Sequence, residues 1–172
     1  MTYVGPIASS LDFFKYVVEP TVAEFFEHPL DVRLGRLAAI VLYHQTDHHA
    51  LIDCIEQNRK NMQNNIEAMR STIISACDEF TIIRDVADAT KHAQLSTASG
   101  TPRKISSYSQ VDVTSGLFQA PFGHGCFVEA CEIFVTLDTG YITPLLPAVR
   151  AVLNYWMSVI SDYPSGSLAK KP

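Results

Sequence analysis

A cluster of turn-forming residues, Ser96 to Pro102, divides the sequence into two parts of different character. Before the cluster, apolar residues recur at the three- and four-residue steps of amphipathic helices. After it, β-branched and aromatic residues dominate, which favours strands. Because glycine and proline end regular helices, no helix is expected to cross this cluster. We therefore expect a helical part followed by a part that contains strands.

Four helices are predicted before the cluster, from apolar periodicity and capping residues. They lie within residues 10–27, about 32–60, 66–76 and 78–95, with a polar break at Asn61 to Asn65. Ser10 and Asp31 are N-cap candidates for the first two. Pro20 should kink or interrupt the first helix. On the second helix, Leu34, Val41 and Leu51 are expected to belong to one apolar stripe.

The second part predicts a small antiparallel sheet and a last helix. Residues 104–113 and 126–137 are rich in strand formers, and Asp138 to Gly140 is typical of a tight turn. Thr143 followed by Pro144 predicts a helix start, and the last helix extends to about residue 161. The expected fold class is mainly α, a helical bundle with a small antiparallel β-hairpin insert at about 103–142 before the last helix. Residues 1–163 should form a single domain and 164–172 a flexible tail.

Composition narrows the classes of function. Of the 172 residues, 47% are hydrophobic, which excludes a disordered chain, and 13 Lys and Arg against 18 Asp and Glu give a net charge of −5. That balance excludes a broad basic surface for nucleic acid. Apolar runs are shorter than the ~20 residues of a membrane span, so no membrane association is expected. The four cysteines form no paired motif, which predicts free thiols and a cytoplasmic location.

The second predicted helix carries a histidine pair. Steps of about 100° per residue place His44 and His48 in the apolar stripe, so both are expected to face the bundle core. Two imidazoles one turn apart are a possible metal pair, and Asp47 and His49 add ligand types nearby. The alternative interpretation is that each histidine is a hydrogen-bonded core residue.

The fourth predicted helix carries Arg84, Asp85, Asp88 and His92 on one face, opposite its apolar side. Asp88 can hold the imidazole of His92 in one tautomer, and Arg84 supplies a fixed cation. A histidine that moves a proton and an arginine that neutralises phosphate charge are the minimum for metal-free RNA cleavage. The alternative is a solvated helix face with an internal salt bridge.

The run Arg84-Asp85-Val86-Ala87-Asp88-Ala89-Thr90-Lys91-His92 and the upstream Leu42-Tyr43-His44-Gln45-Thr46-Asp47 resemble helical-bundle proteins of the HEPN superfamily, in particular uncharacterised bacterial members. The resemblance covers about residues 34–95. Many HEPN proteins are ribonucleases of toxin or phage-defence systems that act as dimers, and others are non-catalytic binding modules. In the family's nuclease motif four to six residues separate the arginine from the histidine, whereas seven separate Arg84 from His92 here.

Three functions follow from these features. A metal-independent endoribonuclease would use Arg84, Asp85, Asp88 and His92 as catalytic residues and need no cofactor. A non-catalytic interaction module would act through a homodimer, a protein partner or RNA. In either case the binding residues are expected to be His44, Asp47, His48 and Lys91, and the basic pairs Arg59–Lys60 and Arg103–Lys104 are the expected phosphate contacts. A metal-binding bundle would instead hold zinc or iron with His44, His48, Asp88 and His92.

Overall fold

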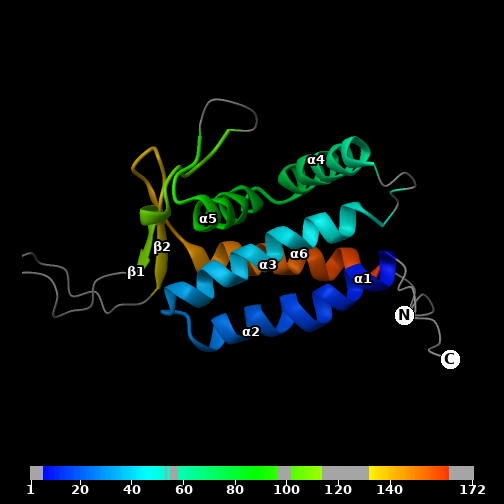
Figure 1. Cartoon of the computed structure of the whole chain (residues 1–172). Helices are drawn as coiled ribbons and strands as arrows, with labels where there is room; N and C mark the ends of the chain where they lie inside the picture. Colours follow the sequence, from blue (N-terminus) through cyan, green and yellow to red (C-terminus); the bar gives the residue numbers. More distant parts are fainter. Residues whose placement is uncertain (1–5, 53, 55–57, 97–101, 114–131, 163–172) are drawn as a thin grey trace, which may run out of the picture.

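The structure is a computed structural model, and it describes residues 6–52, 54, 58–96, 102–113 and 132–162. It is mostly helical, with a three-stranded antiparallel sheet that precedes the last helix. The sheet lies at one end of the helices (Figure 1). The predicted fold class, a helical bundle with a small antiparallel insert before its last helix, is confirmed.

The first predicted helix consists of three helical segments that follow one another without a break. These are α1 (Pro6–Phe13), the π-helical turn η1 (Phe14–Val18) and α2 (Glu19–Glu27). The backbone N–H of Glu19 donates to the carbonyl of Phe14, which is the five-residue step of a π turn. Pro20 is the second residue of α2, directly after the π turn, and helical residues continue on both sides of it. It therefore does not interrupt the helix, although its missing N–H removes one bond from the helical ladder.

The second predicted helix ends ten residues earlier than expected. It is α3 (Val32–Ala50), and the Asp31 side chain caps its start by accepting from the Leu34 N–H at 3.1 Å. The next helix, α4 (Arg59–Ala76), begins after Asn58, whose side chain accepts from the Asn61 N–H at 2.9 Å. The predicted break at Asn61 to Asn65 is therefore wrong. These residues form the first turns of a surface helix, where polar side chains meet water.

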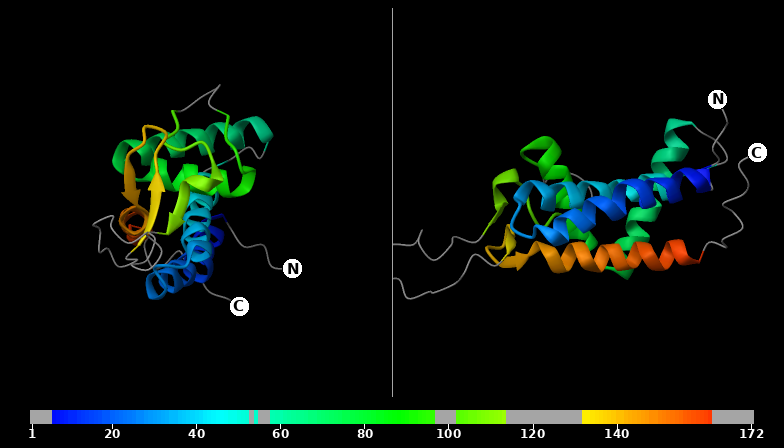
Figure 2. Two further views of the ribbon diagram at one scale, coloured as in Figure 1. Left: turned by 90° about the vertical axis from the view of Figure 1, so that its left-hand side faces the viewer. Right: turned by 90° about the horizontal axis from the view of Figure 1, so that it is seen from below.

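The helix α5 (Phe80–His92) confirms the fourth predicted helix, although it begins two residues later and ends three residues earlier. Ala93 ends it with a φ of 60°. In Figure 2, α4 runs across the long axis that α2, α3 and α6 share. The helix α3 occupies the centre of the bundle, since it packs against α1, α2, α4, α5 and α6.

The sheet has the order β1 (Val111–Val113), β2 (Ile133–Thr136) and β3 (Ile142–Pro144), with both pairs antiparallel. The predicted tight turn is confirmed, because Gly140 has a φ of +86° and donates to the Leu137 carbonyl at 2.8 Å. The first strand begins later than predicted, after the 3₁₀ turn η2 (Tyr108–Gln110). Residues 126–131 of the second predicted strand, and the predicted tail, lie outside the described residues.

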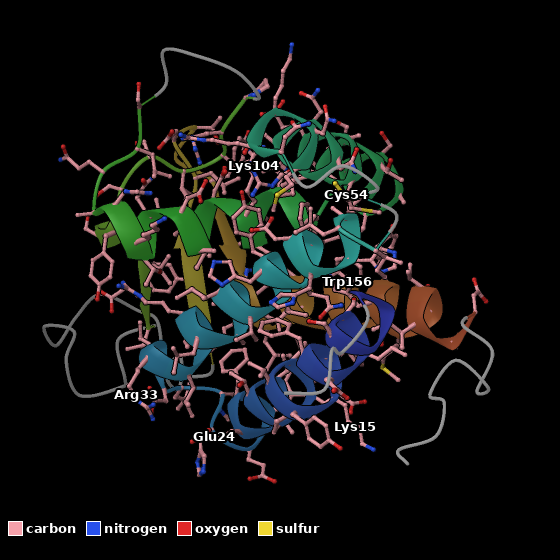
Figure 3. All side chains as sticks on the ribbon, turned by 45° about the vertical axis from the view of Figure 1, so that its right-hand side comes forward. Lys15, Glu24, Arg33, Cys54, Lys104 and Trp156 are labelled. Carbon is pink, nitrogen blue, oxygen red and sulfur yellow. The ribbon has the colours of Figure 1, made fainter. Side chains whose placement is uncertain are left out.

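The last helix, α6 (Leu145–Ser161), confirms its predicted extent and fills one side of the core. Its Trp156 is fully buried, and the indole N–H donates to the Leu42 carbonyl at 3.2 Å. Figure 3 shows Trp156 beside α3, with Lys15 and Glu24 directed away from the bundle. Within the described residues, no helix combines the length and the apolar composition that crossing a bilayer requires.

Candidate functional site

The two predicted core histidines do not face the core. His44 is exposed, and His48 is half-buried with its ring stacked on Phe13 at 4.0 Å between centroids and 12° between planes. The buried positions between Val41 and His48 are instead Leu42, Tyr43, Gln45 and Thr46. The prediction of a core-facing histidine pair is therefore wrong.

The error has a physical cause in the surroundings of α3. Other helices pack on several sides of it, so its buried surface is broader than the stripe through Val41 and Leu51. Polar residues can occupy that surface when they have partners, and the Gln45 amide donates to the Ser10 hydroxyl at 3.0 Å. The prediction assigned buried positions to apolar residues and so did not include Gln45, which is buried. The predicted stripe is therefore displaced from the buried face by about one position.

On α5, the first two predicted catalytic residues form a buried ion pair. Arg84 is 5% exposed and Asp85 is fully buried, and the Arg84 Nε donates to the Asp85 carboxylate at 2.8 Å. The second guanidinium arm donates to the Pro102 carbonyl at 2.7 Å. The expectation of a solvated polar face is therefore wrong at these two positions, because residues 102–104 cover this part of α5.

The same contacts hold the predicted basic pair Arg103–Lys104 against α5. Arg103 lies within hydrogen-bond distance of Asp85, at 3.2 Å, and of Asp88, at 3.0 Å. The Lys104 backbone N–H donates to Asp85 at 2.6 Å, and its ammonium pairs with Asp78 at 2.7 Å. Both cations are thus paired within the chain. The Arg59–Lys60 pair, in contrast, is exposed at the start of α4.

His92 is exposed at the last position of α5, two helical turns beyond Arg84. Arg84 is directed inward to Asp85 and Pro102, so the two side chains do not share a surface. In the described part of the chain, the structure therefore does not bring the predicted pair together in the arrangement that RNA cleavage would need.

A cleft between α3, α4 and α5 brings four of the predicted residues together. Its volume is about 490 Å³, within the range of small-ligand sites. Its lining consists of Ile40, Tyr43, His44, Asp47, Arg70, Ala87, Asp88, Thr90 and Lys91. The predicted binding residues His44, Asp47 and Lys91 thus meet Asp88 here, whereas His48 contacts Phe13 and lies outside this lining.

The charged groups of the cleft are partly paired. Arg70 forms an ion pair with Asp47 at 3.1 Å, and its guanidinium carbon lies 4.7 Å from the centre of the Tyr43 ring. Asp88 is paired with Arg103 at 3.0 Å. His44 and Lys91 are exposed, and no described side chain forms a hydrogen bond or ion pair with either.

Tyr43 forms one wall of the cleft and is 7% exposed. Burial, assisted by the negative charge of Asp88, raises the pKa of its hydroxyl to about 12. The hydroxyl is therefore protonated at neutral pH and can donate a hydrogen bond to a bound group. The cleft thus offers a hydroxyl, an imidazole and two cationic side chains beside the small apolar surface of Ile40 and Ala87.

Three polar residues of the cleft were not predicted as site residues from the sequence: Tyr43, Arg70 and Thr90. Arg70 carried a usable signal, because it lies between Ile66 and Ile73 on the apolar side of its helix. An arginine in that position needs a partner, and its partner Asp47 is 23 residues away. Only the packing of α4 against α3 reveals the pair.

The metal alternative is not supported by side-chain placement. Among the described residues, no group of three or more histidine, cysteine, aspartate or glutamate side chains is placed to hold a metal ion. Of the four predicted ligands, only His44 and Asp88 line the cleft. Within the described part of the chain, Cys54 and Cys77 form no disulfide, and the other two cysteines lie outside that part.

Comparisons with protein-family models, with curated proteins and with solved structures find no match to this chain.

Proposed function

We propose that this protein is a HEPN-like interaction module, and that it binds its partner at the cleft between α3, α4 and α5. The observation that supports this proposal is the burial and hydrogen bonding of Arg84. Its guanidinium is buried against Asp85 and the Pro102 carbonyl, so it is not available to a phosphate next to His92. The unpaired polar groups of this region, His44 and Lys91, lie in the cleft instead.

A cleavage assay tests the first half of the proposal. Labelled single-stranded RNA is incubated in EDTA with the native chain and with His92→Ala, and the products are separated on a denaturing gel. We expect intact RNA in both samples. Cleavage by the native chain that His92→Ala abolishes would overturn the proposal, because general acid–base catalysis contributes about 10²–10⁴-fold to such a reaction. Equal cleavage by both would indicate a contaminating ribonuclease.

The site itself is tested by partner capture from the native host. A tagged chain should retain its partner, and the double variant His44→Ala with Lys91→Ala should lose it. Both substituted side chains are exposed, so the variant should keep its melting temperature. The matched control is His28→Ala with Lys15→Ala, the same two residue types at exposed positions outside the cleft. Equal capture by both double variants would remove the cleft from the proposal.

Self-association stays a prediction, because it follows from the resemblance to HEPN proteins, many of which act as dimers. Light scattering at micromolar concentration should give twice the chain mass of 19.0 kDa. A monomer at all concentrations would contradict the homodimer and would leave a different chain as the partner.

A further inference from the structure

The two carboxylates of the cleft are already neutralised within the chain. Asp47 is paired with Arg70 at 3.1 Å, and Asp88 with Arg103 at 3.0 Å. A cationic ligand would have to displace one of these arginines to reach a carboxylate. Because an arginine held by packing and a second contact is costly to displace, the cleft is poorly suited to cations.

The lining groups that have no partner among the described residues can all donate a hydrogen bond. Lys91 and His44 have no ion pair or hydrogen bond with any described side chain. No described side chain forms a hydrogen bond with the Tyr43 hydroxyl either. The Arg70 Nε is buried and also lacks a hydrogen-bond partner in the structure. The Arg70 Nε is a buried donor without a partner, which is unfavourable, and an acceptor from a ligand would satisfy it. The exposed Lys91 and His44 are hydrated in the free protein and can exchange that water for ligand oxygens.

Charge supports the same conclusion. Arg70 and Lys91 line the cleft with Asp47 and Asp88, so the formal charges of the lining balance. Asp47 is paired with Arg70 and Asp88 with Arg103, whereas the Lys91 ammonium pairs with no described carboxylate. A cation without an acidic partner attracts anions even on a chain whose net charge is −5.

We infer that the cleft binds an oxyanion group, phosphate or carboxylate, that is attached to a small apolar body. Lys91, His44 and the Tyr43 hydroxyl bind the oxygens, and the apolar body packs on Ile40 and Ala87. This inference rests on the proposed function, because it names the chemistry of the ligand at the same site. Lys91 is the principal charged contact, since Arg70 remains paired with Asp47.

The inference is tested by amide chemical-shift titration of the full chain with four small probes. Phenyl phosphate and benzoate carry the two oxyanions, whereas phenol and benzylamine are neutral and cationic controls with the same ring. We expect saturable shifts in the cleft segments of α3, α4 and α5 with phenyl phosphate or benzoate. The probe that binds with the lower dissociation constant shows whether the cleft prefers phosphate or carboxylate. Equal or tighter binding of phenol or benzylamine would overturn the inference.

Variants then locate the binding. Lys91→Ala should weaken the binding of the better oxyanion probe by about 10-fold or more, as expected for a charge-assisted hydrogen bond, and Lys91→Arg should largely restore it. Lys15→Ala, which removes an exposed lysine outside the cleft, should leave binding unchanged. Raising the salt concentration from about 50 mM to about 500 mM should weaken binding further. Binding that is insensitive to Lys91→Ala would overturn the inference.

The two proposals fail in different ways. Partner capture that depends on His44 and Lys91, without binding of either oxyanion probe, would overturn the inference and leave the proposed function in place. Oxyanion binding at the cleft, together with capture that is insensitive to the same residues, would support the inference and overturn the proposed function.

Discussion

Asp85 connects α5 to the segment that follows the turn-forming cluster. Its carboxylate is fully buried and is contacted by Arg84, Arg103 and the Lys104 backbone N–H at 2.6–3.2 Å. Asp85→Asn would leave two guanidinium groups beside a neutral side chain. The amide NH₂ of asparagine would also place a hydrogen-bond donor where Asp85 only accepts hydrogen bonds. We expect a loss of about 3–5 kcal/mol in the free energy of unfolding, as for other broken buried pairs. Urea unfolding at neutral pH measures it.

Asp78→Asn is the matched control for Asp85→Asn. Asp78 pairs with the ammonium of Lys104 at 2.7 Å, but its side chain is 81% exposed. Exposed ion pairs contribute little to stability, so the expected loss in the free energy of unfolding is at most about 1 kcal/mol. Similar losses in the two variants would show that the buried network does not hold residues 102–104 on α5.

The Tyr43 hydroxyl makes stability depend on pH in the alkaline range. Its pKa rises from the ordinary 10.0 to about 12, so the folded chain holds this proton more tightly than the unfolded chain does. The stabilisation is fully present below pH 10 and is lost as the pH rises from 10 to about 12. The shift corresponds to about 2–3 kcal/mol. Tyr43→Phe should remove this part of the pH dependence.

Urea unfolding between pH 9 and pH 12 tests the Tyr43 prediction through the difference between the native chain and Tyr43→Phe. Taking the difference cancels the titration of all other groups. Tyr16→Phe is the control, because the Tyr16 side chain is 66% exposed. A native chain and a Tyr43→Phe variant with parallel pH profiles would contradict the assignment of the shift to Tyr43.

Part of the cleft is readable from single residues of the sequence. His44, Asp47 and Asp88 were singled out from residue type and spacing, and Lys91 from the HEPN resemblance, and all four line the cleft. Arg84 and Asp85 were expected on a solvated face because helical spacing does not tell which face a later segment covers. The Pro102 carbonyl that Arg84 contacts is 18 residues away, so its position follows only from the tertiary fold.

At the scale of the elements, Gly35 allows α3 to lie close to its neighbours. A Cβ at this position would lie 3.0 Å from Ile133 Cδ1 and from Leu145 Cδ2, and 3.3 Å from Phe25 Cε2. The three neighbouring side chains are fully buried and come from β2, α6 and α2, so none can move aside freely. Gly35 is thus a contact point between four elements.

Gly35→Ala should therefore lower stability although alanine is the better helix former. Overpacking of this kind costs about 1–3 kcal/mol, and the gain in helix propensity offsets up to about 1 kcal/mol. We expect a net loss, reaching about 2 kcal/mol, in the free energy of unfolding from urea titration. A gain of about 1 kcal/mol would mean that α3 can move away from β2 and α6 without cost.

Helix boundaries were the least predictable property of the elements. Asn58 caps α4, but the many polar residues that follow it concealed a helix start two residues before the expected break. The strands were predicted correctly in kind, since β-branched residues and the Asp138 to Gly140 turn are local signals. The π turn η1 was not predicted, because no local residue pattern distinguishes it from an ordinary helical turn.

At the scale of the whole molecule, the amount of burial differs sharply between the helices. Ten residues of α3 and nine of α5 are buried, whereas Ile73 is the buried residue of α4. A helix with so little buried surface can detach while the rest of the bundle stays folded. Because Arg70 lies on α4, such a local opening would also open the cleft.

Hydrogen exchange followed by mass spectrometry should therefore show α4 exchanging faster than α3 and α5, by about 10-fold or more at neutral pH. Arg70→Met should increase the rate in α4 further, since it removes the ion pair with Asp47 that holds α4 to α3, and leave the rates in α5 unchanged. The control is Arg59→Met, which removes an exposed arginine at the start of the same helix. Exchange in α4 as slow as in α3 would contradict independent opening, and equal effects of the two substitutions would exclude the Arg70–Asp47 pair as the contact that limits it.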